Sequence, residues 1–191
     1  MGSAVQQTLM FIVQFIFGMY SFVIVLRLWL RMADADYNHP FVASIAKSTT
    51  PVIRKLQKFL PNVGHFETAS LVLLLIVTLV KLILVSFISG YIPHVGGLLA
   101  WTLASMIEAI LDTAFYLMIM MAILSWIPNA QPMLYGLLIQ ITTPILMPVR
   151  RCVPLLGGMD LSPVVVLIVI QVLEMLMVQP VIRASLSAAF H

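Results

Sequence analysis

Long runs of residues almost without charge constrain this chain more than any other feature. The first 26 residues contain no Asp, Glu, Lys or Arg, and further apolar runs cover residues 68–90, 95–126 and 161–182. A helix needs about 20 mainly apolar residues to cross a membrane. Charged residues make up 9% of the chain, against about 25% in a typical soluble domain. We therefore expect an all-α integral membrane protein and exclude a soluble enzyme, a disordered chain and a disulfide-rich secreted module.

The apolar runs predict four transmembrane helices, at about residues 9–30, 68–90, 106–126 and 161–182. The third run is too long for one crossing, because the 32 residues from Val95 to Trp126 would form a helix of about 48 Å against about 30 Å of hydrocarbon. We expect an interfacial or re-entrant piece over about residues 95–105, followed by the span. A fifth full crossing is the competing interpretation.

The basic residues predict the orientation, since lysine and arginine accumulate in cytoplasmic loops. Eight of the ten basic residues lie in the two long connections between spans: Arg27, Arg31, Lys47, Arg54, Lys55, Lys58, Arg150 and Arg151. With four spans, both connections are cytoplasmic and both termini lie outside the cytoplasm, whereas five spans would put the connections on opposite sides. The distribution favours four spans. It also attributes the net charge of +3 to membrane topology, with no nucleic-acid binding expected.

A pattern in the first connection returns in the second. Thr49-Thr50-Pro51 is followed 93 residues later by Thr142-Thr143-Pro144. The same offset aligns Pro61 with Pro154, Gly64 with Gly157, and Glu67 with Asp160. We predict two parallel repeats, residues 1–93 and 94–191, which enter the membrane in the same direction. Each repeat has two spans joined by an interfacial amphipathic helical hairpin, at about residues 40–62 and 132–156.

Each hairpin carries a threonine before a proline, a pattern typical of the start of a helix. The predicted N-caps and first helical residues are Thr50 with Pro51 and Thr143 with Pro144. A short apolar helix is expected before each pair, over about residues 40–46 and 132–141. The acids Glu67 and Asp160 stand at the start of the following spans, where we interpret them as capping the positive end of the helix.

The basic residues of the hairpins are candidate contacts for lipid or for a partner. After Pro51 the apolar residues follow helical spacing, and the basic residues lie on the other face. The predicted basic set is Arg54, Lys55, Lys58, Arg150 and Arg151. Such a helix is expected to lie in the interface and contact anionic phospholipid headgroups. Two alternatives stay open: the charges fix only the topology, or they bind a protein partner.

Four polar residues inside the predicted spans form a candidate layer: Gln14, Lys81, Asp112 and Glu174. Counted at 1.5 Å per residue from the cytoplasmic span ends, all four lie about 18–21 Å deep. Ionisable residues in spans are candidates for function. We expect Lys81 to pair with Asp112, Glu174 or both, and Glu108 to lie near the outer surface in contact with water. The layer is interpreted as a clasp between helices, with an ion or proton pathway and separate snorkelling as alternatives.

Sequence motifs for catalysis or cofactor binding are not found. The chain has no glycine-rich phosphate loop and no G-x-S-x-G motif. Its four histidines are dispersed, so we predict no catalytic, cofactor or metal site. Cys152 is the only cysteine, which excludes an intramolecular disulfide.

The second hairpin resembles the YggT family of small bacterial membrane proteins, whose relatives in Gram-positive bacteria and chloroplasts are called YlmG. A Pro-x-x-x-Pro-x-Arg-Arg-x-x-Pro block from Pro144 to Pro154, followed by Gly-Gly-x-Asp ending at Asp160, carries the resemblance. The first repeat departs from the block, with Arg54-Lys55 in place of Met147-Pro148. The resemblance implies a non-enzymatic, multi-pass protein of the bacterial inner membrane, of a family linked to osmotic stress or ion homeostasis, to cell division, or to assembly of membrane complexes.

Two functions are therefore expected. The first is an accessory, assembly or envelope-homeostasis factor whose basic hairpins contact anionic lipid or a membrane-protein partner. The alternative is a component of a small ion channel or transporter that uses Lys81, Asp112 and Glu174. A chain of this size would need to form a homo-oligomer to enclose a pore.

Overall fold

The computed structural model describes residues 3–35, 39–58, 67–90, 94–126, 132–151 and 162–189. All regular elements in these ranges are helices: α1 (Ser3–Met32), α2 (Pro40–Gln57), α3 (Thr68–Ser89), α4 (Val95–Trp126), α5 (Pro132–Arg150), α6 (Ser162–Leu173), η1 (Glu174–Val178) and α7 (Gln179–Ala189). The all-helical prediction is confirmed for this part of the chain. Six residues named above lie outside it: Pro61, Gly64, Cys152, Pro154, Gly157 and Asp160.

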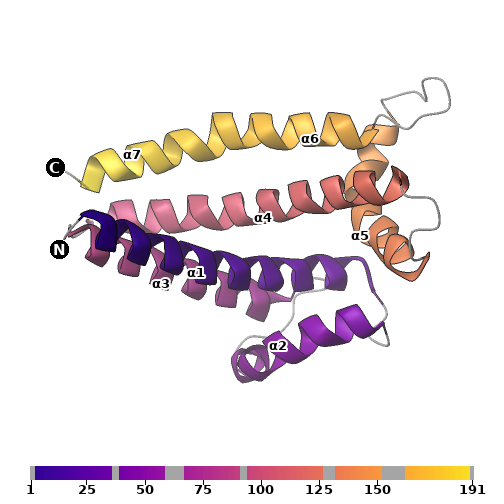
Figure 1. The fold of residues 1–191 in the computed structure, drawn as a ribbon, viewed down its shortest axis with the longest axis horizontal. Helices are drawn as coiled ribbons and strands as arrows, with labels where there is room; N and C mark the ends of the chain where they lie inside the picture. Colours follow the sequence, from indigo (N-terminus) through magenta and orange to yellow (C-terminus); the bar gives the residue numbers. More distant parts are fainter. Residues whose placement is uncertain are drawn as a thin grey trace.

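The long helices run side by side (Figure 1). They are α1, α3, α4 and the continuous helix formed by α6, η1 and α7, and both termini lie at one end of this bundle. The shorter helices α2 and α5 lie at the other end. Among the described residues, five helices are long and apolar enough to cross a membrane: the four long helices and the segment Met133–Arg150 in α5. Because α5 does not run along the other four, the number of crossings stays a prediction.

Helix α4 differs from the prediction, because it does not divide near Ser105. It is one continuous helix of 32 residues. Both glycines of this region, Gly96 and Gly97, lie in its first turn, and no glycine or proline follows before its end, so nothing interrupts its backbone hydrogen bonds. A Cβ atom at Gly97 would stand 3.1 Å from the carbonyl oxygen of Ser185. The first turn of α4 is therefore packed closely against α7.

The predicted helix starts at Thr50-Pro51 and Thr143-Pro144 are wrong. Helix α2 begins at Pro40, where His39 is the N-cap and its Nδ1 accepts a hydrogen bond of 3.2 Å from the backbone N–H of Phe41. The helix then continues through Pro51. In the same way, α5 continues through both of its internal prolines. The short apolar helix expected before each pair is joined to the helix that follows it.

Packing explains why α2 continues through a proline. An internal proline removes one backbone hydrogen bond and bends a helix, and the last turns of α2 are seen nearly end-on in Figure 1 while its first turns lie across the view. The buried residues Val42, Ile45 and Ile53 lie on both sides of Pro51. Burial of this single apolar face stabilises α2 on both sides of the bend.

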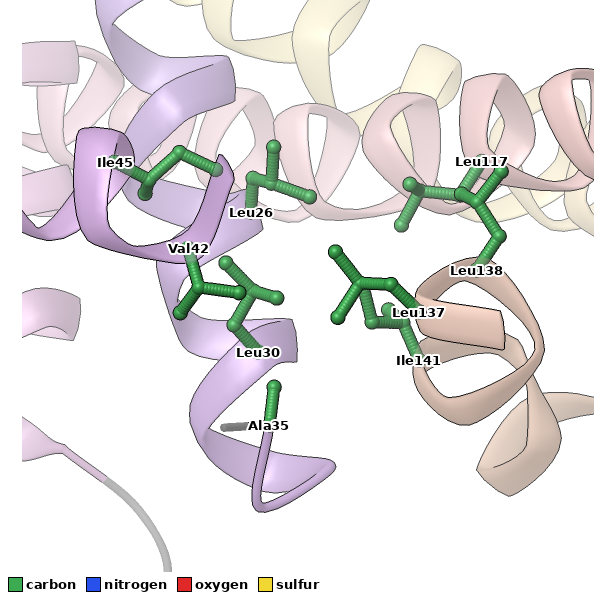
Figure 2. Close-up of a cluster of buried hydrophobic side chains, with 9 residues drawn as sticks. All are labelled: Leu26, Leu30, Ala35, Val42, Ile45, Leu117, Leu137, Leu138 and Ile141. Carbon is green, nitrogen blue, oxygen red and sulfur yellow. The ribbon is translucent and has the colours of Figure 1, made fainter. Parts of the chain in front are cut away.

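An apolar cluster joins the two shorter helices to the end of α1 (Figure 2). Its buried members come from α1 and the residues directly after it, α2, α4 and α5: Leu26, Leu30, Ala35, Val42, Ile45, Leu117, Leu137, Leu138 and Ile141. Gln140 of α5 adds hydrogen bonds from its Nε2 to the carbonyl oxygens of Ala33, at 2.9 Å, and Asp34, at 3.3 Å. Both hairpin helices are thus fixed to the same end of the bundle.

Candidate functional site

A buried ion pair joins α1 to the start of α3. The Nε of Arg27 donates to Oε2 of Glu67 at 2.8 Å, and its Nη2 donates to Oε1 at 2.9 Å. The two residues are 8% and 1% exposed. A bidentate pair has the most favourable geometry for an arginine and a carboxylate, and a buried pair needs further hydrogen bonds to offset the loss of water.

Residues of α2 and α3 supply those hydrogen bonds. The Nη1 of Arg27 donates to the hydroxyl oxygens of Thr49, at 2.9 Å, and Thr50, at 3.0 Å. Gln57 Nε2 donates to Glu67 Oε1 at 2.8 Å, and the Ser70 hydroxyl donates to Glu67 Oε2. The resulting network, which we call the arginine elbow, fixes α2 against α1 and α3.

Burial alone would raise the pKa of Glu67. Hydrogen bonds from Arg27 and Ser70, and the positive charges of Arg27 and Arg31, outweigh that effect and hold the pKa of Glu67 below its usual value. Glu67 is therefore a carboxylate that balances the arginine. Its position before α3 matches the predicted cap, but its side chain makes no capping hydrogen bond to the backbone. Sequence reasoning missed the pair, because 40 residues separate its members.

The cationic side of α2 faces away from the bundle. Its basic residues Lys47, Arg54 and Lys55, and Lys58 directly after it, are exposed. The opposite side is buried against the bundle through the apolar residues described above. At the end of α5, Arg150 and Arg151 are also exposed. The apolar face of α2 is therefore packed on the protein itself, and the basic side chains of α2 are exposed on its other face.

A second polar region lies between the long helices. A cavity of about 580 Å³ is lined by α1, α3 and α4. Its lining includes the polar residues Gln14, Ser21, Lys81, Ser105, Glu108 and Asp112. Lys81 of α3 is within electrostatic reach of Glu108 and Asp112, which lie one turn apart on α4. Three residues of the predicted layer, Gln14, Lys81 and Asp112, therefore line one cavity.

Glu174 lies on the other side of α4 from this cavity. Its carboxyl group is within hydrogen-bonding reach of the Asp112 carboxyl, and Gln171 Nε2 donates to its Oε2 at 3.2 Å. Lys81 is thus within electrostatic reach of Asp112 but forms no salt bridge with it, and the Asp112 and Glu174 carboxyl groups are within hydrogen-bonding reach of each other. Glu174 is also the first residue of η1, a π-helical segment, and such segments are often found at functional sites.

Glu108 belongs to the same region. It was expected near the outer surface in contact with water. The structure places it half-buried in the cavity lining, where Gln179 Nε2 donates to its Oε1 at 3.4 Å, and its contact with water stays a prediction. Its spacing of four residues from Asp112 predicts that both residues lie on one face of the helix. In the described part of the chain, no group of three or more His, Cys, Asp or Glu residues is placed to hold a metal ion.

Comparison with known proteins gives one consistent match. The family model described as CCB3/YggT matches residues 6–88 and again residues 100–181. The uncharacterized protein YggT of Escherichia coli K12 is 31% identical over 170 residues, which cover 88% of each chain. A protein of Vibrio alginolyticus, described as an uncharacterized protein in the proC 3' region, is 32% identical over 87% of this chain and 91% of its own. An uncharacterized protein of Pseudomonas aeruginosa is 34% identical over 88% of this chain and 87% of its own. No solved structure matches.

Proposed function

The chain belongs to the CCB3/YggT family, and on that premise we propose that it is a non-enzymatic accessory or assembly factor of the bacterial inner membrane. In this proposal it presents a fixed cationic surface to anionic phospholipid headgroups at the cytoplasmic side. Membrane-protein partners that approach this surface would be held beside it. The relatives' descriptions name no enzymatic activity.

The observation that carries the proposal is the way the arginine elbow holds α2. The elbow and the apolar face of α2 fix one side of the helix, so Lys47, Arg54, Lys55 and Lys58 project together from the other. A basic residue near an anionic membrane surface contributes about 1 kcal/mol. Because α2 is already ordered, little conformational entropy is lost when the surface binds.

The arrangement of the helices supports the orientation that this proposal needs. The four long helices lie side by side with both termini at one end and both hairpin helices at the other (Figure 1). Together with the positive charges of the two connections, this supports four crossings with both termini outside the cytoplasm. The double match of the family model, to residues 6–88 and 100–181, supports the proposed duplication.

Lipid retention tests the proposal. The full chain is reconstituted in nanodiscs of phosphatidylglycerol and phosphatidylcholine, and the lipids that stay bound are identified by native mass spectrometry. We expect the wild type to retain phosphatidylglycerol preferentially, and the variant Arg54→Gln/Lys55→Gln/Lys58→Gln to lose that preference. Arg183→Gln is the matched control, because Arg183 is exposed on α7, away from the hairpins. A triple variant with the wild-type preference would show that these charges fix only the topology.

A second candidate function is a component of an ion channel or transporter. The observation that favours it is the cavity in which Lys81, Glu108 and Asp112 meet. It would agree with the ion homeostasis that the family resemblance implies. Ion flux into vesicles that contain the protein, compared with vesicles that contain Glu174→Gln, tests it, since a conducting layer predicts loss of flux without loss of fold.

A further inference from the structure

The charges around the cavity between α1, α3 and α4 do not balance. Three carboxyl groups, those of Glu108, Asp112 and Glu174, lie within electrostatic reach of one another, and the amine of Lys81 acts on only two of them, Glu108 and Asp112. An uncompensated charge inside a membrane protein is costly. One lysine can compensate one carboxylate, so the other two carboxyl groups need further positive charge. This charge must come from protons or bound cations.

A buried hydroxyl group in the same cavity indicates that the cavity holds water. Ser21 of α1 is 4% exposed, lines the cavity, and its Oγ has no hydrogen-bond partner in the part of the chain that the structure describes. Buried polar groups are nearly always hydrogen-bonded to protein or to ordered water. A water molecule takes up about 30 Å³, so the 580 Å³ of the cavity accommodates several molecules beside Ser21 and the carboxyl groups.

Glu174, the neighbour of Asp112, has one unpaired carboxyl oxygen. Oε1 of Glu174 is buried and has no hydrogen-bond partner among the described residues, and the carboxyl group of Glu174 is within hydrogen-bonding reach of the Asp112 carboxyl. An ionised carboxylate only accepts hydrogen bonds, whereas a protonated carboxyl also donates one. A single proton shared by Asp112 and Glu174 would therefore supply a hydrogen-bond donor between the two carboxyl groups and remove one of the uncompensated charges.

We propose that Asp112 and Glu174 form a proton-binding site inside the membrane, which exchanges its proton with water in the cavity beside Ser21. A hydronium ion in the cavity gives its proton to a carboxylate oxygen of the pair and becomes water, and release reverses this step. The groups that face Asp112 are Lys81 from α3, Glu108 on its own helix, Glu174 from η1, and the neutral lining of α1. The site goes beyond the lipid docking proposed above and is independent of it.

Infrared spectroscopy of the full chain in nanodiscs tests the shared proton. We expect the wild type to show the C=O band of a protonated carboxyl group that disappears as the pH is raised. Asp112→Asn and Glu174→Gln should each remove this band. Asp34→Asn, which changes an exposed acid after α1, should leave it unchanged. A band that survives in both site variants would overturn the proposal, and so would a band that responds to K⁺ or Na⁺ but not to pH.

Thiol labelling tests the water in the cavity and does not depend on the acidic variants. In a Cys152→Ser background, Ser21→Cys is expected to react with a small charged methanethiosulfonate reagent at least ten times faster than Thr78→Cys. Thr78 is the matched control, since its hydroxyl is also buried and unpaired but does not line the cavity. Equal and slow labelling at both positions would mean that the cavity is dry, which contradicts the proposed exchange with water.

Discussion

Two threonines at corresponding positions of α2 and α5 meet different partners. Thr49 and Thr142 are both 0% exposed, and each hydroxyl donates to the carbonyl oxygen four residues earlier, at 2.8 Å and 2.7 Å. Thr49 also accepts a hydrogen bond from Arg27 of α1, whereas Thr142 contacts the sulfur of Met121 of α4 at 3.1 Å. We call the second arrangement the methionine elbow.

The comparison distinguishes the packing that positions a hairpin helix from the additional effect of an ion pair on stability. In both elbows a fully buried threonine of the hairpin helix packs against the preceding long helix. The methionine elbow achieves this with a thioether, so a buried charge is not required for the packing. An apolar replacement for a buried ion pair is often neutral or stabilising, whereas removal of one partner is costly. The arginine elbow therefore depends on both of its charges being present.

The largest effect is expected from breaking the arginine elbow on one side. Glu67→Gln leaves the buried Arg27 without its counter-charge and should lower the free energy of unfolding by about 3–5 kcal/mol. Arg27→Met combined with Glu67→Met makes this elbow resemble the other and should recover most of the loss. Chemical denaturation in detergent measures both. If the double variant is less stable than Glu67→Gln, the comparison between the elbows is wrong.

The two threonines provide a smaller test. Thr49→Val removes an acceptor from the buried Arg27 and should cost about 1–3 kcal/mol. Thr142→Val removes only a contact with sulfur and a local helix hydrogen bond, so a cost below about 1 kcal/mol is expected. Thermal unfolding of the two variants side by side gives the difference. Equal losses would mean that the Arg27 contact adds nothing to the elbow.

The arginine elbow should also make stability depend on pH. The folded-state pKa of Glu67 is depressed, so its stabilisation is fully present above the unfolded-state pKa and is lost as the pH falls through the folded-state value. We expect the midpoint of unfolding to fall on acidification, and the part that depends on Glu67 to be absent in Arg27→Met/Glu67→Met. Parallel slopes for the wild type and the double variant would contradict this assignment.

The smallest change in stability is expected from removing the hydrogen bonds that link α5 to the end of α1. Gln140 links α5 to the end of α1 through exposed hydrogen bonds, so Gln140→Ala should change stability by only about 0.5 kcal/mol. Ile141→Ala is the matched variant, because Ile141 is buried in the apolar cluster, and it should cost about 2–5 kcal/mol. Similar losses in the two variants would show that polar contacts, and not apolar packing, hold the hairpin helices together.

The sequence was sufficient for features that depend on local pattern. The apolar run at residues 68–90 became α3, Thr68–Ser89, because a span of that length has no other stable form in lipid. Helical spacing also placed Ile53 on the buried side of α2 and Arg54 on the exposed side. Depth along the spans predicted that Lys81 and Asp112 would lie at one level, and both line the same cavity.

The remaining features depend on how helices pack, which local pattern does not contain. Pro51 was a valid signal for a helix start, but the apolar face that continues across it decided the outcome. Arg27 and Glu67 meet only because α1 and α3 lie side by side. The partners of Glu108 and Glu174 depend on how far each helix is rotated about its axis, and the π-helical segment alters that rotation.

The widened turn at residues 174–178 bears on how the last helix tolerates changes in length. A π-helical turn holds an extra residue, and one added residue in an α-helix rotates all that follow by about 100°. Loss of a single residue from this turn would therefore be absorbed by a return to ordinary α-helical geometry, and Ser185 would keep its place against Gly97. The same deletion in the middle of α3, which has no such turn, would move half of that helix out of phase with its neighbours.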